Sequence, residues 1–86
     1  MAEVLENSVT SGDANDFTAF GFYNFSLDVI NTPFNYGIIL AIPAKTSGIK
    51  MCFHLAVERN TISTPKVAYR TFRDSEEYGW SVWKII

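Results

Sequence analysis

The clearest pattern in this 86-residue chain is a strict alternation of apolar and less apolar side chains over residues 49–57. A repeat of two is typical of a half-buried antiparallel strand. We predict that the odd-numbered set faces the core and the even-numbered set faces the opposite side. The odd set is Ile49, Met51, Phe53, Leu55 and Val57, and the even set is Lys50, Cys52, His54 and Ala56.

Four further segments have strand character. Residues 20–27 are rich in aromatic side chains, and residues 38–42 form a continuous apolar run typical of an interior strand. Residues 66–72 alternate again, and residues 79–86 end the chain in an apolar run. With residues 43–48 as a hairpin connection of four to six residues, the pattern predicts an all-β fold, a five-stranded antiparallel meander or sandwich.

The final strand holds both tryptophans, Trp80 and Trp83. A terminus is normally polar and frayed, so an apolar ending indicates a strand docked on the domain. Positions three apart on a regular strand point to opposite faces. We therefore predict that Trp83 lies in the core and that Trp80 points to a subunit interface or a ligand.

The first part of the chain differs from the rest. Residues 1–12 are expected to be an arm or linker, and residues 2–9 fit a helix or an extended segment equally well. Residues 11–17 are turn-forming, and Asp13 is a candidate cap for a short helical turn. The β domain is expected to span residues 13–86.

Composition narrows the possible partners. The formal net charge is −2 with no run of basic residues, which argues against nucleic acid or an anionic membrane as partner. No stretch reaches the roughly 20 apolar residues of a membrane span, and the acidic start is unlike a signal peptide. The single Cys52 fits folding in a cytoplasm. The aromatic content of 15% is high for so small a domain and indicates burial between subunits.

No constellation of catalytic or metal-binding residues stands out. Cys52 and His54 are the only cysteine and the only histidine, and they lie two apart with no third orienting group nearby in the sequence. One of each cannot supply the four ligands of a zinc site. We expect no enzyme activity, no metal and no cofactor. Trp80, with Phe34 and Tyr36 from a loop, could instead stack on a sugar ring, although packing in the core or between subunits is the simpler explanation of these aromatic rings.

The order of several short motifs resembles the pyocin-knob-like domain of bacteriophage tail fibres and related phage appendages, over about residues 13–86. In that family an Asp-x-Asn stretch precedes Gly-x-Tyr, an Asn-x-Pro loop leads into a Tyr-Gly-x-Leu strand, and Tyr-x-Arg precedes a closing Trp-Ser-x-Trp-Lys. The matching residues here are Asp13-Ala14-Asn15-Asp16-Phe17, Gly21-Phe22-Tyr23, Asn31-Thr32-Pro33, Tyr36-Gly37-Ile38-Ile39-Leu40, Tyr69-Arg70 and Trp80-Ser81-Val82-Trp83-Lys84. Two loops depart from the family pattern, residues 58–65 and the charged turn at residues 74–77.

This resemblance implies a non-enzymatic fibre domain that is made in the host cytoplasm, carried on the virion with other virion structural proteins, and assembled as a homotrimer. Residues 1–12 would then connect to a preceding fibre segment. Its expected role is recognition of a glycan on the host surface. The alternative is a structural trimeric knob or a head-fibre domain without a ligand of its own.

Overall fold

The computed structural model describes residues 11–59, 63–74 and 79–86. The expected charged turn at residues 74–77 lies largely outside these residues, as do residues 1–10 of the expected arm. The fold is mostly β, with 57% of the described residues in strands. Its elements are β1 (Gly12–Asp13), the short 3₁₀ helix η2 (Ala14–Asp16), β2 (Gly21–Phe25), β3 (Val29–Ile30), β4 (Gly37–Thr46), β5 (Ile49–Glu58), β6 (Val67–Arg73) and β7 (Lys84–Ile85).

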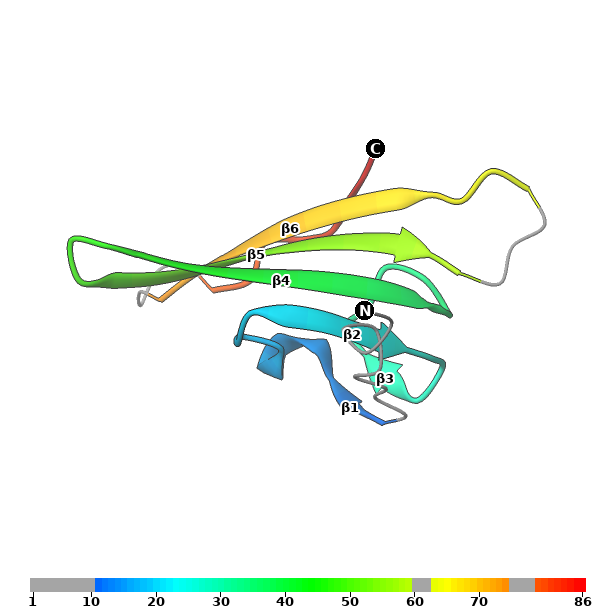
Figure 1. Cartoon of the computed structure of the whole chain (residues 1–86), viewed down its shortest axis with the longest axis horizontal. Helices are drawn as coiled ribbons and strands as arrows, with labels where there is room; N and C mark the ends of the chain where they lie inside the picture. The colour runs from blue at the N-terminus through cyan, green and yellow to red at the C-terminus, as the bar shows by residue number, and fades with distance from the viewer. Residues whose placement is uncertain (1–10, 60–62, 75–78) are drawn as a thin grey trace.

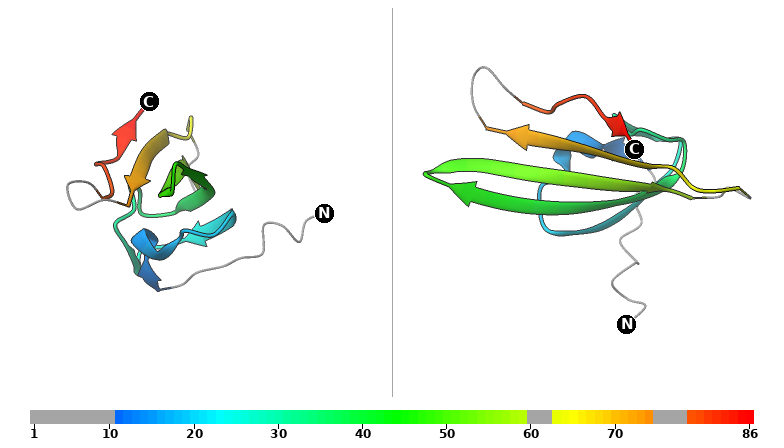
Figure 2. Two further views of the ribbon diagram at one scale, coloured as in Figure 1. Left: turned by 90° about the vertical axis from the view of Figure 1, so that its left-hand side faces the viewer. Right: turned by 90° about the horizontal axis from the view of Figure 1, so that it is seen from above.

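Five strands form one antiparallel sheet in the order β2-β4-β5-β6-β7 (Figure 1). Each strand pairs with the next one of the sheet along the chain, so the predicted five-stranded meander is confirmed. The sheet curves from β2 around to β7 when it is seen end-on (Figure 2, left). No helix in the described part of the chain has the length and apolar character needed to cross a membrane.

The hairpin between β4 and β5 is tighter than expected. Its connection is the dipeptide Ser47-Gly48, with φ angles of 51° and 79°, rather than residues 43–48. Positive φ at both positions is typical of the two-residue turn that matches the twist of antiparallel strands. β4 therefore continues through Pro43, beyond Ala41 where its pairing with β2 ends. Proline is tolerated there because one side of β4 no longer has a neighbouring strand.

The expected orientation of β5 is wrong. Cys52 and His54 are buried, with 2% and 1% of their surface exposed, whereas Phe53 and Leu55 are 37% and 39% exposed. The alternation is present, but the buried side of the sheet is the one to which the smaller residues of β5 point. We call this buried side the covered side. The core cluster consists of Ala14, Phe17, Phe25, Val29, Ile39 and Ala56, with Tyr23, Phe34 and Trp83 packed against it.

The physical reason is that aromatic rings from outside the central strands fill the covered side. These rings need small residues beneath them, and Gly37 illustrates the fit: a Cβ atom there would lie 2.6 Å from Cζ of Phe25. The other side of the sheet has no such cover within the described residues. Five of its large apolar side chains are 37–46% exposed. We call this side the open face and define it by these five residues, which are Ile42, Phe53, Leu55, Val57 and Tyr69.

The N-terminal segment folds over the covered side. Asp13 caps η2, as predicted, and its side chain accepts a hydrogen bond from the backbone N–H of Asn15. A two-residue parallel pairing of β1 with β3, which the sequence did not indicate, brings Asp13 next to the loop that follows Ile30. Asn31 in that loop has a left-handed backbone conformation, with φ of 63°. These contacts position the site described next.

Candidate ligand-binding hollow

A buried arginine stands at the centre of the covered side. Arg70 lies on β6 directly opposite His54 on β5, and only 4% of its surface is exposed. The alternation of β6 places Arg70 on the same side as Ala68, which is fully buried. A charge in such a place needs partners, because burial of an uncompensated guanidinium group is costly.

Two indole rings provide part of that compensation. Cζ of Arg70 lies 3.9 Å from the ring centroid of Trp80 and 4.6 Å from that of Trp83. Both distances are within the range of cation–π attraction. The prediction that the two tryptophans point to opposite faces is therefore wrong. Residues 80–83 do not form a regular strand, since β7 begins at Lys84 and Trp80 makes only an isolated bridge to Phe72, so the rule of alternation does not apply.

One indole is anchored to the short helix η2 and the other to the loop that follows β3. Nε1 of Trp80 donates to the backbone oxygen of Asn15 at 3.3 Å, and Nε1 of Trp83 donates to the backbone oxygen of Asn31 at 2.9 Å. Oδ1 of Asp13 accepts from the backbone N–H of Asn15 and from Nδ2 of Asn31, each at 2.8 Å. These hydrogen bonds hold the pKa of Asp13 below its ordinary value. One half-buried carboxylate thus fixes both residues that hold the tryptophans.

His54 completes the setting of Arg70. Its Nδ1 accepts a hydrogen bond from Nε of Arg70 at 3.2 Å, and its Nε2 lies 2.7 Å from the backbone oxygen of Phe17. A ring that accepts at Nδ1 and faces a carbonyl at Nε2 is the neutral tautomer with the proton on Nε2. Burial lowers the pKa of His54 to about 4, and the nearby positive charge of Arg70 adds to this effect. The histidine is therefore neutral at physiological pH.

Arg70 remains charged but incompletely partnered. Burial lowers its pKa to about 10, still far above neutrality. Its Nη2 is buried and has no hydrogen-bond partner in the described part of the chain. The same is true of Oδ1 of Asn15. Buried donors and acceptors are satisfied in the great majority of cases, so two unsatisfied atoms in one place require an explanation.

Both of these residues line the same open hollow, which has a volume of about 440 Å³. Polar groups without partners beside aromatic rings are typical of the lining of sites for polar ligands with an apolar face. The lining consists of Asn15, Asn31, Thr32, Arg70, Trp80, Ser81, Val82 and Trp83. We refer to it as the Arg70 hollow.

The other predicted stacking residues lie elsewhere. Trp80 lines the Arg70 hollow, but Phe34 is half-buried against the core and lines a separate hollow beyond Asn31 and Thr32. Tyr36 is half-buried, with Cζ of Arg59 5.7 Å from its ring centroid. The structure therefore does not gather Trp80, Phe34 and Tyr36 into one surface. Trp83, expected in the core, does pack against the core cluster and also lines the Arg70 hollow.

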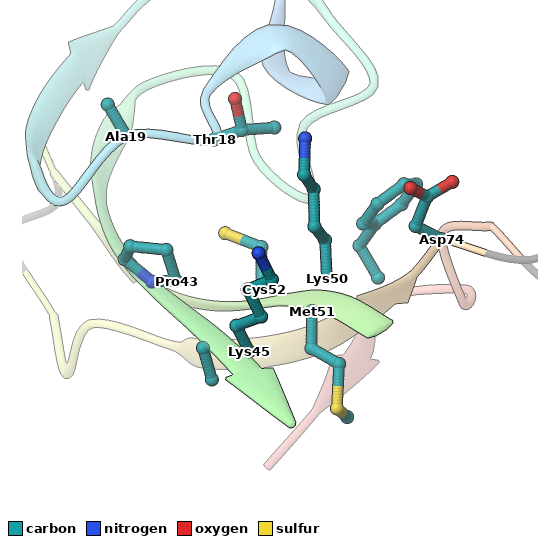
Figure 3. Close-up of a pocket in the computed structure, with 10 residues that line it drawn as sticks. Thr18, Ala19, Pro43, Lys45, Lys50, Met51, Cys52 and Asp74 are labelled. Carbon is teal, nitrogen blue, oxygen red and sulfur yellow. The ribbon is translucent and has the colours of Figure 1, made fainter. Parts of the chain in front are cut away.

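A larger pocket of about 730 Å³ lies near the β4–β5 hairpin. Figure 3 shows Thr18 and Ala19 on one side of it and Pro43 and Cys52 on the other. Sγ of Cys52 lies 3.8 Å from the backbone oxygen of Phe17, and burial raises the pKa of this thiol, so it is not a reactive nucleophile. None of the unpartnered buried atoms found in the described residues belongs to this pocket. The Arg70 hollow is the stronger candidate site.

No group of three or more His, Cys, Asp or Glu side chains is placed to hold a metal ion in residues 11–59, 63–74 and 79–86. Comparison with known proteins gave no match to a family model, a curated protein or a solved structure.

Proposed function

We propose that this chain is a non-enzymatic appendage domain of a bacteriophage or phage-like particle, and that it recognises a glycan on the host surface. The order of sequence motifs supports the appendage role, and the Arg70 hollow supports glycan binding. The observation that carries the binding proposal is the pair of unpartnered polar atoms, Nη2 of Arg70 and Oδ1 of Asn15, beside two indole rings. Sugar rings offer an apolar face for aromatic stacking and hydroxyl groups for such atoms.

Binding can be tested with a glycan array and with host cells. Asn15→Leu removes the unpartnered acceptor but keeps the size of the side chain and the backbone hydrogen bonds of residue 15. Replacing an unsatisfied polar group by an apolar one of similar shape costs little stability, so this variant should fold and lose binding. Asn35→Leu changes an exposed asparagine outside the hollow and serves as the matched control. An array with no bound glycan would refute the binding proposal.

The second part of the proposal is that the chain assembles into an oligomer, and the open face supports it. This observation alone would also fit the alternative, a structural trimeric knob without a ligand. The five side chains of the open face expose about 400 Å², if a large side chain offers about 200 Å² in full. A contiguous apolar patch of that size is within the range of about 300–600 Å² for the largest patch of a monomer, and such patches are often functional. We propose that copies of this chain cover it in a homotrimer. The threefold symmetry rests on the family resemblance.

The oligomer is tested by sedimentation equilibrium. Leu55→Lys places a charge on the open face, at a residue that is 39% exposed in the monomer, so it should dissociate the trimer without unfolding the chain. Leu27→Lys makes the same change at a residue that is 61% exposed and outside the open face, and should leave the trimer intact. A monomeric wild-type protein at micromolar concentration would refute this part of the proposal.

A further inference from the structure

We propose that the Arg70 hollow is selective for acidic saccharides, with an anionic oxygen of the sugar bound by the guanidinium group of Arg70 and a hydroxyl group bound by Oδ1 of Asn15. This inference rests on the proposed glycan-binding function and specifies the chemistry of its ligand. The anionic group is a carboxylate or a phosphate carried on a sugar ring.

The first argument is the unpaired charge. Within the described residues, no carboxylate forms an ion pair with Arg70 within 4.0 Å. Asp13 is close enough to favour the charged form of Arg70, but its Oδ1 already accepts hydrogen bonds from Asn15 and Asn31. Buried charges in proteins are normally paired or coordinated. An anionic ligand would supply the pairing that the described residues do not.

The second argument is the preorganisation of the guanidinium group. Nε of Arg70 donates a hydrogen bond to His54, and the rings of Trp80 and Trp83 make cation–π contacts with the guanidinium carbon. Nη2 is the donor left without a partner. Because side-chain freedom has already been lost, a ligand oxygen gains a charge-assisted hydrogen bond without the entropy cost of ordering an exposed arginine.

The third argument distinguishes an acidic sugar from a simple anion. Oδ1 of Asn15 accepts hydrogen bonds and does not donate them, so the ligand must also offer a donor. A simple carboxylate ion has only acceptors, and a simple phosphate ion, whose P–OH group can donate at neutral pH, offers no ring face to the indoles. A sugar that carries an anionic group offers both kinds of group, together with a ring face for the indoles.

The experiment uses the full chain and follows the indole N–H signals of Trp80 and Trp83 by NMR during titration. The probes are methyl β-D-glucuronide for the carboxylate, glucose 6-phosphate for the phosphate, methyl β-D-glucoside as the neutral sugar, and sodium acetate and sodium phosphate as simple anions. At least one acidic sugar should bind saturably, and at least tenfold more tightly than the neutral sugar and its own simple anion. Which acidic sugar binds identifies the source of the charge.

A matched pair of variants locates the effect. Asn15→Asp introduces a carboxylate of nearly the same shape into the hollow, where it competes with the ligand for Arg70. It should weaken binding of the acidic sugar at least tenfold and raise the midpoint of urea unfolding. Asn35→Asp makes the same change of net charge outside the hollow and should behave like the wild-type protein. The rise in stability shows that Asn15→Asp is folded when binding is lost.

The outcomes separate this inference from the proposed function. Equal binding of the neutral and acidic sugars would overturn the charge selectivity and leave glycan binding in place. Equal loss of affinity in Asn15→Asp and Asn35→Asp would also overturn it, as a general effect of net charge. Simple anions that bind as tightly as the acidic sugars would overturn the role of the sugar ring. If no sugar binds and the glycan array is also empty, the proposed function fails with the inference.

Discussion

Lowering the pH from 7.5 to 5 should destabilise this domain through one side chain, His54, the only histidine in the chain. Burial lowers its pKa in the folded state to about 4, from an ordinary value of 6.5. Between these two values the unfolded chain binds a proton that the folded chain does not. The stabilising contribution is therefore complete above about pH 6.5 and is lost as the pH falls toward 4.

The size of the effect follows from the two pKa values. Proton linkage gives a loss of about 2 kcal/mol between pH 7.5 and pH 5. Screening by solvent reduces this value little, because only 1% of the surface of His54 is exposed. A loss of about 2 kcal/mol is a large fraction of the free energy of unfolding of a domain this small. The pKa of Asp13 is lowered from 3.8, so its own loss of stability begins below the pH window chosen here.

Urea unfolding at pH 7.5, 6 and 5 measures the loss. His54→Gln is the control, because a glutamine side chain can accept from Arg70 and donate to Phe17 without titrating. This variant should be less stable at pH 7.5 but should show a much smaller change toward pH 5. NMR titration gives the pKa directly, since a single histidine leaves no ambiguity of assignment. A native-state pKa near 6.5, or equal stability at pH 7.5 and 5, would refute the reasoning.

Two further predictions concern the packing of the covered side. Trp80→Ala and Trp83→Ala should each lower the free energy of unfolding by about 2–4 kcal/mol, because each removes one of the two rings that cover the buried charge of Arg70. An unchanged urea midpoint in either variant would contradict this packing of the two rings. Gly37→Ala should cost about 1–3 kcal/mol through the clash with Phe25. Gly79→Ala, where an added Cβ meets nothing within 4 Å, is its control and should change the melting temperature little.

Local sequence patterns were sufficient to predict the five strands of the sheet and their order, but not the short strands β1 and β3, the short extent of β7 or which side of the sheet is covered. The alternation over residues 49–57 shows that two sets of side chains lie on opposite sides of the strand, but it does not show which set is buried. The more apolar set was assigned to the core. That assignment failed because Cys52 and His54 lie under rings from other segments, and because His54 finds partners in Phe17 and Arg70. Partners from residues 16 or more positions away leave no signal in the local pattern. The turn at Ser47-Gly48 did have a local signal, a Ser-Gly dipeptide between apolar runs, and could have been recognised.

The candidate site was predictable only in part. Trp80 was identified, but Arg70 was seen only as a member of a motif, and Asn15 only as part of a turn-forming segment. An arginine in an alternating strand is normally exposed at one side of a sheet. Here the environment of Arg70 is set by contacts with residues distant in the sequence. Residues 80–83 do not have regular strand geometry, and both indoles lie over the same guanidinium group. The rule that alternate residues of a strand point to opposite faces cannot predict where the chain stops being a regular strand.

The orientation of β5 also has a consequence for the two halves of the proposed function. Odd-numbered residues such as Phe53 and Leu55 belong to the open face, whereas His54 between them supports Arg70 on the covered side. A trimer that buries the open face would therefore leave the Arg70 hollow on the other side of each sheet. Three hollows on one particle would gain affinity through multivalency even if each binds weakly. A stoichiometry of three sugars per trimer by calorimetry would support this separation. A folded Leu55→Lys monomer that no longer binds the sugar would contradict it.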